Sequence, residues 1–282
     1  MPLAKPSRGI EELVDVNSGR EIIATPVVVD RFEDLMKKYD AFLSIPITFQ
    51  ETIREYMSTV NDVLTPSEID SFLHHTTLRE EHGRYTELTG YFVSRLIQCS
   101  YDTGNRVFYV DTHSLKLFHD MGARVVGNID RKLELTIHGE IGDMCGENTQ
   151  NANIVVGTTG NFLGSHAYNS TFKGRTAGDK CGFKTKNCTF TIEEVGHGCG
   201  FKVQQSTFTI GTAGNLCGLE SKHSTFTIEK AGEYCGWASM HSTFNTHSPE
   251  QYKRFKESVP QDKDNKLYLL SNTGSIIKGG EW

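Results

Sequence analysis

Hydrophobic and polar residues alternate with a period of two in short stretches over the second half of the chain. In residues 224–228 a serine, a phenylalanine and an isoleucine alternate with two threonines. After a turn at residues 231–232, Cys235, Trp237 and Ser239 alternate with smaller residues. A period of two is typical of a strand with one buried and one exposed face. The pattern therefore predicts two short strands, the second with Cys235, Trp237 and Ser239 on one face.

Both stretches recur every 18 residues between about residues 133 and 245. The recurring positions hold four cysteines (Cys181, Cys199, Cys217 and Cys235), the glycine after each cysteine, the glycine three residues before it, and five phenylalanines (Phe172, Phe190, Phe208, Phe226 and Phe244). Such self-similarity marks a stack of equivalent units. Because two strands joined by glycine-rich turns fill the 18 residues, each unit is interpreted as one coil of a parallel β-helix, with neighbouring coils about 4.8 Å apart.

Stacking places each residue over its equivalent in the next coil. Inside, we expect a phenylalanine column, a cysteine column and an isoleucine column of Ile192, Ile210 and Ile228. At the corner before each inward serine or cysteine, the aligned side chains are amides that give way to imidazoles: Asn151, Asn169, Asn187, Gln205, His223 and His241. Asparagine tolerates the left-handed conformation, so this corner column is expected to satisfy backbone groups of the turns.

Glycines in the repeats follow the spacing Gly-x-x-Gly-x-x-x-Gly. The spacing is complete in three coils: Gly139, Gly142 and Gly146; Gly157, Gly160 and Gly164; Gly211, Gly214 and Gly218. Over about residues 133–245 this pattern resembles that of the GXGXG β-helix family, which includes the C-terminal domain of glutamate synthase and the C subunit of formylmethanofuran dehydrogenase. The first glycine is missing at Arg175, Glu193 and Glu229. The resemblance implies a right-handed winding and a structural and docking role without catalytic residues of its own.

The residues before the repeats have the periodicity and capping signals of helices. The predicted elements are a strand over residues 21–29, then helices over 31–43, from a capping box at 48–51, from a second capping box at 65–68 to residue 83, and over 85–101. A strand over 106–111, a short helix near 114–120 and an irregular first coil at 121–128 lead into the repeats.

After the repeats, Ser248 and Pro249 start a predicted helix that runs to Glu257, and a strand follows over residues 266–271. The open ends of a β-helix expose unpaired strand edges, so both flanking regions are expected to act as caps. The predicted fold is mainly β. It has a helical α/β domain over residues 1–120, a right-handed parallel β-helix over 121–246 and a C-terminal cap over 247–282.

Composition narrows the function classes. The formal net charge of −6 argues against a nucleic-acid partner. The chain has no apolar run of 18 residues, so no membrane span is expected, and residues 1–6 lack the apolar core of a secretory signal. Seven cysteines are an odd count, and five of them occupy inward repeat positions, which fits a reducing compartment. The simplest location is therefore the cytoplasm.

Three groups of side chains are candidates for chemistry. The cysteine column offers soft metal ligands, but a column points along a line and does not converge, so we interpret it as core. Three helix histidines lack the His-Glu-x-x-His spacing of a zinc site and are interpreted as ordinary: His74, His75 and His82. A polar cluster at the domain junction, interpreted as a solvated loop, contains Asp111, His113, His119 and Asp120. We expect no catalytic, metal or cofactor site.

Outward threonines form the candidate binding face. Three coils carry Thr-x-Thr pairs: Thr189 and Thr191, Thr207 and Thr209, Thr225 and Thr227. A flat threonine array resembles the ice-binding face of some antifreeze proteins, but threonine also suits exposed strands because its branched side chain packs against cross-strand neighbours. We therefore expect a non-catalytic structural or docking subunit that presents rigid faces to protein partners. Two alternatives stay open: a protein that binds ice or carbohydrate through the threonines, and an enzyme with its site between the N-terminal domain and the β-helix.

Overall fold

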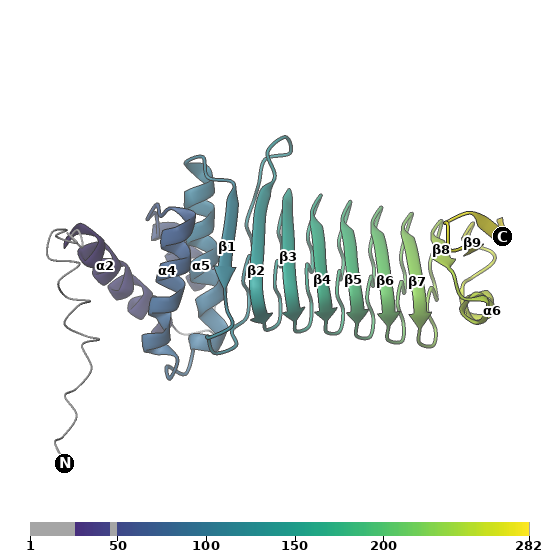
Figure 1. The fold of residues 1–282 in the computed structure, drawn as a ribbon, viewed down its shortest axis with the longest axis horizontal. Helices are drawn as coiled ribbons and strands as arrows, with labels where there is room; N and C mark the ends of the chain where they lie inside the picture. The colour runs from purple at the N-terminus through teal and green to yellow at the C-terminus, as the bar shows by residue number, and fades with distance from the viewer. Residues whose placement is uncertain (1–25, 46–49, 282) are drawn as a thin grey trace, which may run out of the picture.

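The strands of the protein stack in one direction along the long axis of an elongated molecule (Figure 1). This computed structural model describes residues 26–45 and 50–281, and these residues include a ten-stranded sheet whose strands lie in chain order. Neighbours from β1 to β9 pair in parallel, and β10 is antiparallel to β9. The strands are β1 (Val107–Asp111), β2 (Leu133–Ile141), β3 (Ala152–Thr159), β4 (Thr171–Ala177), β5 (Thr189–Val195), β6 (Thr207–Ala213), β7 (Thr225–Ala231), β8 (Thr243–Thr246), β9 (Lys266–Leu270) and β10 (Ile276–Glu281). The predicted mainly β fold, a parallel β-solenoid with an 18-residue spacing, is confirmed.

Equivalent residues face each other across neighbouring strands, as the repeat predicts. Phe190 pairs with Phe208, and Phe208 with Phe226, and all three are buried. The rings of Phe190 and Phe208 are nearly parallel, at 1°, with centroids 4.7 Å apart. Their spacing matches the distance between hydrogen-bonded strands, so the ring column and the backbone ladder stabilise the same register.

The prediction of a second strand in each coil, over residues 235–239 and their equivalents, is wrong. These residues form turns, and only one isolated bridge per coil follows them, for example Lys186 with Gln204. The reason is three left-handed positions in the turn, at Tyr234 (φ 57°), Gly236 (φ 75°) and Ala238 (φ 55°) in the last coil. Cys235 and Ser239 still point inward, whereas Trp237 is exposed.

The glycine after each column cysteine and the glycine three residues before it are needed for different reasons. Gly200 has a φ of 67°, and a Cβ on it would lie 2.6 Å from the Phe226 ring. Gly214 has no left-handed backbone, but a Cβ there would lie 2.9 Å from the carbonyl carbon of Gly196 in the preceding coil. The first column therefore supplies a left-handed turn and the second a close approach of two backbones.

Helices cover the N-terminal end of the stack (Figure 1). They are α2 (Pro26–Leu43), α3 (Gln50–Thr59), α4 (Pro66–His75), the 3₁₀ helix η1 (Thr76–Arg79) and α5 (Tyr85–Asp102). The capping box at Thr65 and Glu68 is confirmed: the Thr65 hydroxyl accepts the Glu68 N–H, and the Glu68 carboxylate accepts the Thr65 N–H. The capping box predicted at 48–51 lies largely outside the described residues.

Three local predictions in this region are wrong. Residues 26–29 of the predicted strand belong to α2, with Pro26 in its first turn, where proline costs no hydrogen bond; residues 21–25 lie outside the described residues. The third helix ends at His75 and does not reach residue 83, because the hydroxyls of Thr76 and Thr77 donate to carbonyls three residues back and the chain tightens into η1.

The short helix predicted near residues 114–120 is a series of turns and bends. Its backbone N–H groups bond to other elements: the His119 N–H donates to the Thr86 carbonyl of α5, and the Asp120 N–H to the Asp143 carbonyl. Strand β1 before it pairs with β2, so the sheet begins inside the range assigned to the N-terminal domain. The domain boundaries stay predictions.

Both ends of the solenoid are covered. At the N-terminal end, Asp70 of α4 accepts the Asp111 N–H of β1, a strand-edge donor, at 2.9 Å. At the other end lies α6 (Pro249–Ser258), whose Phe255 ring is 5.7 Å from the Phe244 ring, the last of the phenylalanine column. Caps of this kind keep the core at the ends of the stack away from other chains, whereas β10 is the last strand of the sheet. Among the described residues no helix is long and apolar enough to cross a membrane.

Candidate functional site

The six predicted threonines lie together on one face of β5, β6 and β7, here called the Thr face. Thr189, Thr207 and Thr225 form one row across the strands, and Thr191, Thr209 and Thr227 form the second. The threonines of β5 and β6 are exposed and those of β7 are half-buried. Hydroxyl groups therefore repeat at the inter-strand distance of about 4.8 Å, and each can donate and accept a hydrogen bond.

A shallow hollow of about 450 Å³ lies on the Thr face. Its lining includes Gly211 on β6, which has no side chain, and Glu193 on β5 and Glu229 on β7, the strands on either side. The Glu229 carboxylate is 2.6 Å from Nδ1 of His247. A surface of hydroxyls with carboxylates along one border can hydrogen-bond a polar partner, but it lacks the convergent acid and base of a hydrolytic site.

The cysteine column belongs to the core, as predicted. Its members are fully or almost fully buried: Cys145, Cys181, Cys199, Cys217 and Cys235. Burial raises the pKa of the Cys145 thiol to about 12. The thiolate is the form that attacks electrophiles and binds metals, so these side chains behave as small apolar residues.

The three helix histidines do not converge. Nδ1 of His74 is 2.9 Å from the Asp70 carbonyl and Nδ1 of His75 is 2.8 Å from the Ser71 carbonyl, each one turn back in α4. Nδ1 of His82 accepts the Arg84 N–H. Within residues 26–45 and 50–281, no group of three or more His, Cys, Asp or Glu side chains is placed to hold a metal ion.

The polar cluster at the domain junction splits in two. Asp111 and His113 form an exposed pair, with 2.7 Å between carboxylate and Nδ1. Asp120, in contrast, is only 6% exposed, so the interpretation as a solvated loop does not hold for it. Burial raises the pKa of the Asp120 carboxyl to about 7, although a hydrogen bond from the Tyr91 side chain opposes this shift. Oδ1 of Asp120 has no hydrogen-bond partner among the described residues.

A column of hydrogen-bond acceptors that was not predicted lies beside the turn glycines. Each side chain accepts the backbone N–H of the equivalent residue one coil later: Asp143 from Asn161, Asn161 from Asp179, Asp179 from His197, His197 from Asn215 and Asn215 from Glu233. The signal is visible in the sequence, because each of these residues directly follows a glycine of the 18-residue repeat. The column satisfies turn N–H groups that no strand ladder reaches.

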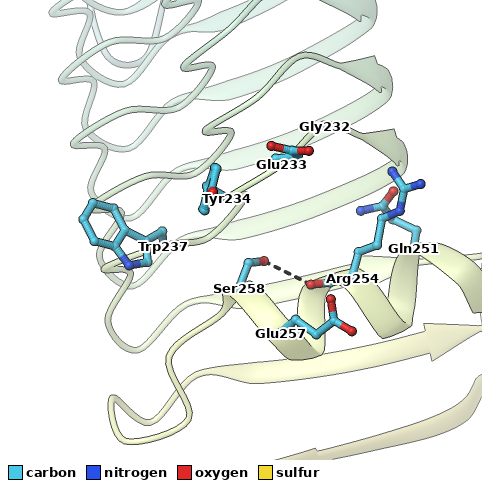
Figure 2. A pocket seen from close by; sticks show the side chains of 8 residues that line it. All are labelled: Gly232, Glu233, Tyr234, Trp237, Gln251, Arg254, Glu257 and Ser258. Carbon is cyan, nitrogen blue, oxygen red and sulfur yellow. Dashed lines mark hydrogen bonds between the residues drawn. The ribbon is translucent and has the colours of Figure 1, made fainter.

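A pocket that no sequence pattern predicts lies at the C-terminal cap. It has a volume of about 610 Å³ and lies between the turn of the last coil and α6 (Figure 2). The coil supplies Gly232, Glu233, Tyr234 and Trp237, and α6 supplies Gln251, Arg254, Glu257 and Ser258. These two sets are brought together only by the docking of α6 on the last coil.

The chain matches no family model, no curated protein and no solved structure in comparisons with known proteins. The resemblance to the GXGXG β-helix family therefore stays a prediction that rests on the glycine spacing alone.

Proposed function

We propose that this protein is a non-catalytic docking protein whose solenoid presents the Thr face to a protein partner. The observation that carries the proposal is the in-register double row of threonines on a stack covered at both ends. Strand pairing already fixes the backbone of such a face, so binding costs little further ordering of the chain. A docking role is also what the resemblance to the GXGXG family implies.

The size of the face supports a protein partner. The Thr face covers three strands, but the same side of the sheet continues over the seven strands from β2 to β8, which at about 4.8 Å apart and roughly 23 Å long give on the order of 700 Å². A standard protein interface buries about 800 Å² on each partner. This side of the sheet, which includes the Thr face, therefore has room for a small stable interface without any contribution from the caps.

The alternatives have weaker support. An ice-binding or carbohydrate-binding array needs a long regular face, but Lys173 interrupts the second threonine row on β4 and Asn245 interrupts it on β8. An enzyme site at the junction needs convergent groups, whereas Asp111 and His113 form an exposed pair and Asp120 is buried. The buried free thiols favour a cytoplasmic location, which we include in the proposal.

The test is a triple variant with Thr191, Thr209 and Thr227 each replaced by lysine. Thr191 and Thr209 are at exposed strand positions, which are tolerant, so we expect a loss of about 1 kcal/mol or less at each of them in the free energy of unfolding. Thr227 is half-buried and its hydroxyl accepts a hydrogen bond from Asn245, so we expect the largest of the three losses there. The partner that co-purifies with the parent protein from native extract should be lost. A matched control carries three lysines outside the Thr face, among the residues that form the one isolated bridge in each coil. The replaced residues are Tyr168, Gln204 and Met240, and this control should keep the partner.

Two results would contradict the proposal. One is a parent protein that purifies alone, or a partner that the triple variant still binds. The other is thermal hysteresis in solutions of the parent that disappears in the triple variant, because it would establish ice binding by the Thr face. Circular dichroism and melting curves on all three proteins check that each is folded.

A further inference from the structure

The pocket at the C-terminal cap contains a buried hydrogen-bond donor without a partner. Gln251 of α6 is only 5% exposed, and its Oε1 accepts the Ala231 N–H at 3.0 Å. This bond fixes which way the amide faces, because the Ala231 N–H requires the oxygen. The amide nitrogen is left with no hydrogen-bond partner among the described residues. Buried donors in proteins are nearly always paired, so this one indicates a place for a ligand acceptor.

The charges around the pocket disfavour anionic ligands. Arg254 lies next to Gln251 on α6 (Figure 2), and its guanidinium already forms an ion pair with Glu250 at 3.0 Å. The carboxylates of Glu233 and Glu257 line the pocket, and neither has an ion-pair partner among the residues that the structure describes. A phosphate or carboxylate group would meet two uncompensated negative charges there. The carboxylates instead call for hydrogen-bond donors on the ligand.

Two exposed aromatic side chains lie on the coil side of the pocket. Trp237 is 57% exposed and Tyr234 is 60% exposed, and Figure 2 places the Trp237 indole at the outer rim. Both belong to the same turn, in which the Trp237 backbone N–H donates to the Tyr234 carbonyl. An indole face presents a rigid apolar plane that suits a flat apolar face on a ligand.

We propose that this pocket binds a neutral saccharide. A sugar ring has an apolar C–H face for Trp237, hydroxyl donors for the carboxylates of Glu233 and Glu257, and oxygen acceptors for the amide of Gln251. A cationic peptide would satisfy the carboxylates but would bring positive charge next to Arg254. The inference does not rest on the Thr face, because the pocket lies on the turn of the last coil and on α6.

Tryptophan fluorescence tests the proposal directly. Trp237 is one of two tryptophans, and the Trp282→Phe variant leaves it as the only reporter. This variant is titrated with cellotetraose, chitotetraose, maltotetraose and mannotetraose, and with poly-L-lysine and inorganic phosphate as charged probes. We expect a saturable change with at least one of the four sugars and none with poly-L-lysine or phosphate.

Titration calorimetry on two further variants separates the contribution of the Gln251 donor to sugar binding from that of the Trp237 ring. Gln251→Glu keeps the acceptor for the Ala231 N–H and removes the donor, and Trp237→Ala removes the aromatic plane. Each should weaken sugar binding by about tenfold or more, since a site built around a polar group discriminates strongly when the pairing is lost. The control Tyr109→Ala removes a side chain of matched exposure, 59%, at the other end of the molecule, and should leave affinity unchanged.

The proposal is overturned if none of the four sugars binds up to millimolar concentration. It is equally overturned if poly-L-lysine or phosphate binds in their place, or if sugar binding survives Trp237→Ala in a protein with the parent's melting temperature. Because Trp237 is exposed and contributes little to the core, loss of binding in that variant is not explained by unfolding, even if Gln251→Glu folds poorly.

Discussion

At the scale of single residues, the buried cysteines give the first prediction. In the folded protein, the column cysteines should resist a thiol-labelling reagent, because burial raises the thiol pKa, to about 12 at Cys235 and to about 11 at Cys188 beside the column. After denaturation all seven cysteines of the chain should react. A chelator should leave the melting temperature unchanged. Rapid labelling of the folded protein, or zinc bound in stoichiometric amount, would show that the column is not closed core.

The corner column shows what the sequence can predict about single residues. Asn151 and Asn169 have φ angles of 50° and 49°, as their tolerance for the left-handed region predicts, and the Asn169 amide donates to the Asn151 side-chain oxygen at 2.7 Å. Further along the stack, His223 and His241 have the same backbone and stack their rings 4.8 Å apart. The repeat predicts such positions well because a residue and its neighbours above and below are all 18 residues apart.

At the scale of elements, Asp120 joins α5 to the first coil and gives a pH-dependent prediction. Its folded pKa of about 7 lies above the value of about 3.9 for an unfolded aspartate. With respect to this carboxyl, the folded protein therefore has its full stability below about pH 4 and loses stability as the pH rises from there through about 7. Replacing Asp120 with asparagine, which keeps a neutral side chain and tolerates the φ of 63°, removes this loss.

We expect the Asp120→Asn variant to exceed the parent in free energy of unfolding by roughly 2–4 kcal/mol above pH 7, with the difference shrinking toward pH 4. Denaturant titrations of both proteins at a series of pH values measure it. A difference that is constant across pH would mean that Asp120 does not change its protonation between folded and unfolded protein.

Elements outside the repeat were predicted less well, for a physical reason. Residues 114–120 carry a helix-like pattern, but the backbone groups of His119 and Asp120 bond to α5 and to the next coil, so tertiary contacts replace helical ones. Trp237 follows a period of two, yet the left-handed Gly236 turns it outward. The pocket at the cap depends on how α6 docks on the last coil, and neither local propensity nor the 18-residue period contains that information.

At the scale of the whole molecule, the repeat gives each coil of the solenoid the same contacts as its neighbours. Every strand from β4 to β8 faces an equivalent neighbour, so one coil's contacts predict the next. The repetition ends at the two caps, and the features that the repeat does not predict lie there. Stability of such a stack is approximately a sum of coil contributions and contributions from neighbouring coils.

Deleting residues 206–223 tests this additivity, because it removes one 18-residue coil with β6 and its turn. Ser224 then follows Gln205, Phe226 takes the place of Phe208, and every column stays in register. The shortened protein should fold cooperatively with a modest loss of stability. Deleting residues 206–214 removes half a coil and places a phenylalanine strand against a cysteine turn, which misaligns the turn glycines and leaves ladder groups unpaired. That variant should fail to fold.

Circular dichroism and denaturant titrations of the two deletions measure the difference, and a co-purification assay adds a functional readout. If the partner spans two separate docking points on the solenoid, the one-coil deletion should fold but lose the partner, since the points move about 5 Å closer. If the partner contacts only what remains of the Thr face, binding should weaken without being lost, because two of the three threonine pairs persist. Equal unfolding of both variants would contradict the 18-residue coil as the unit of the fold.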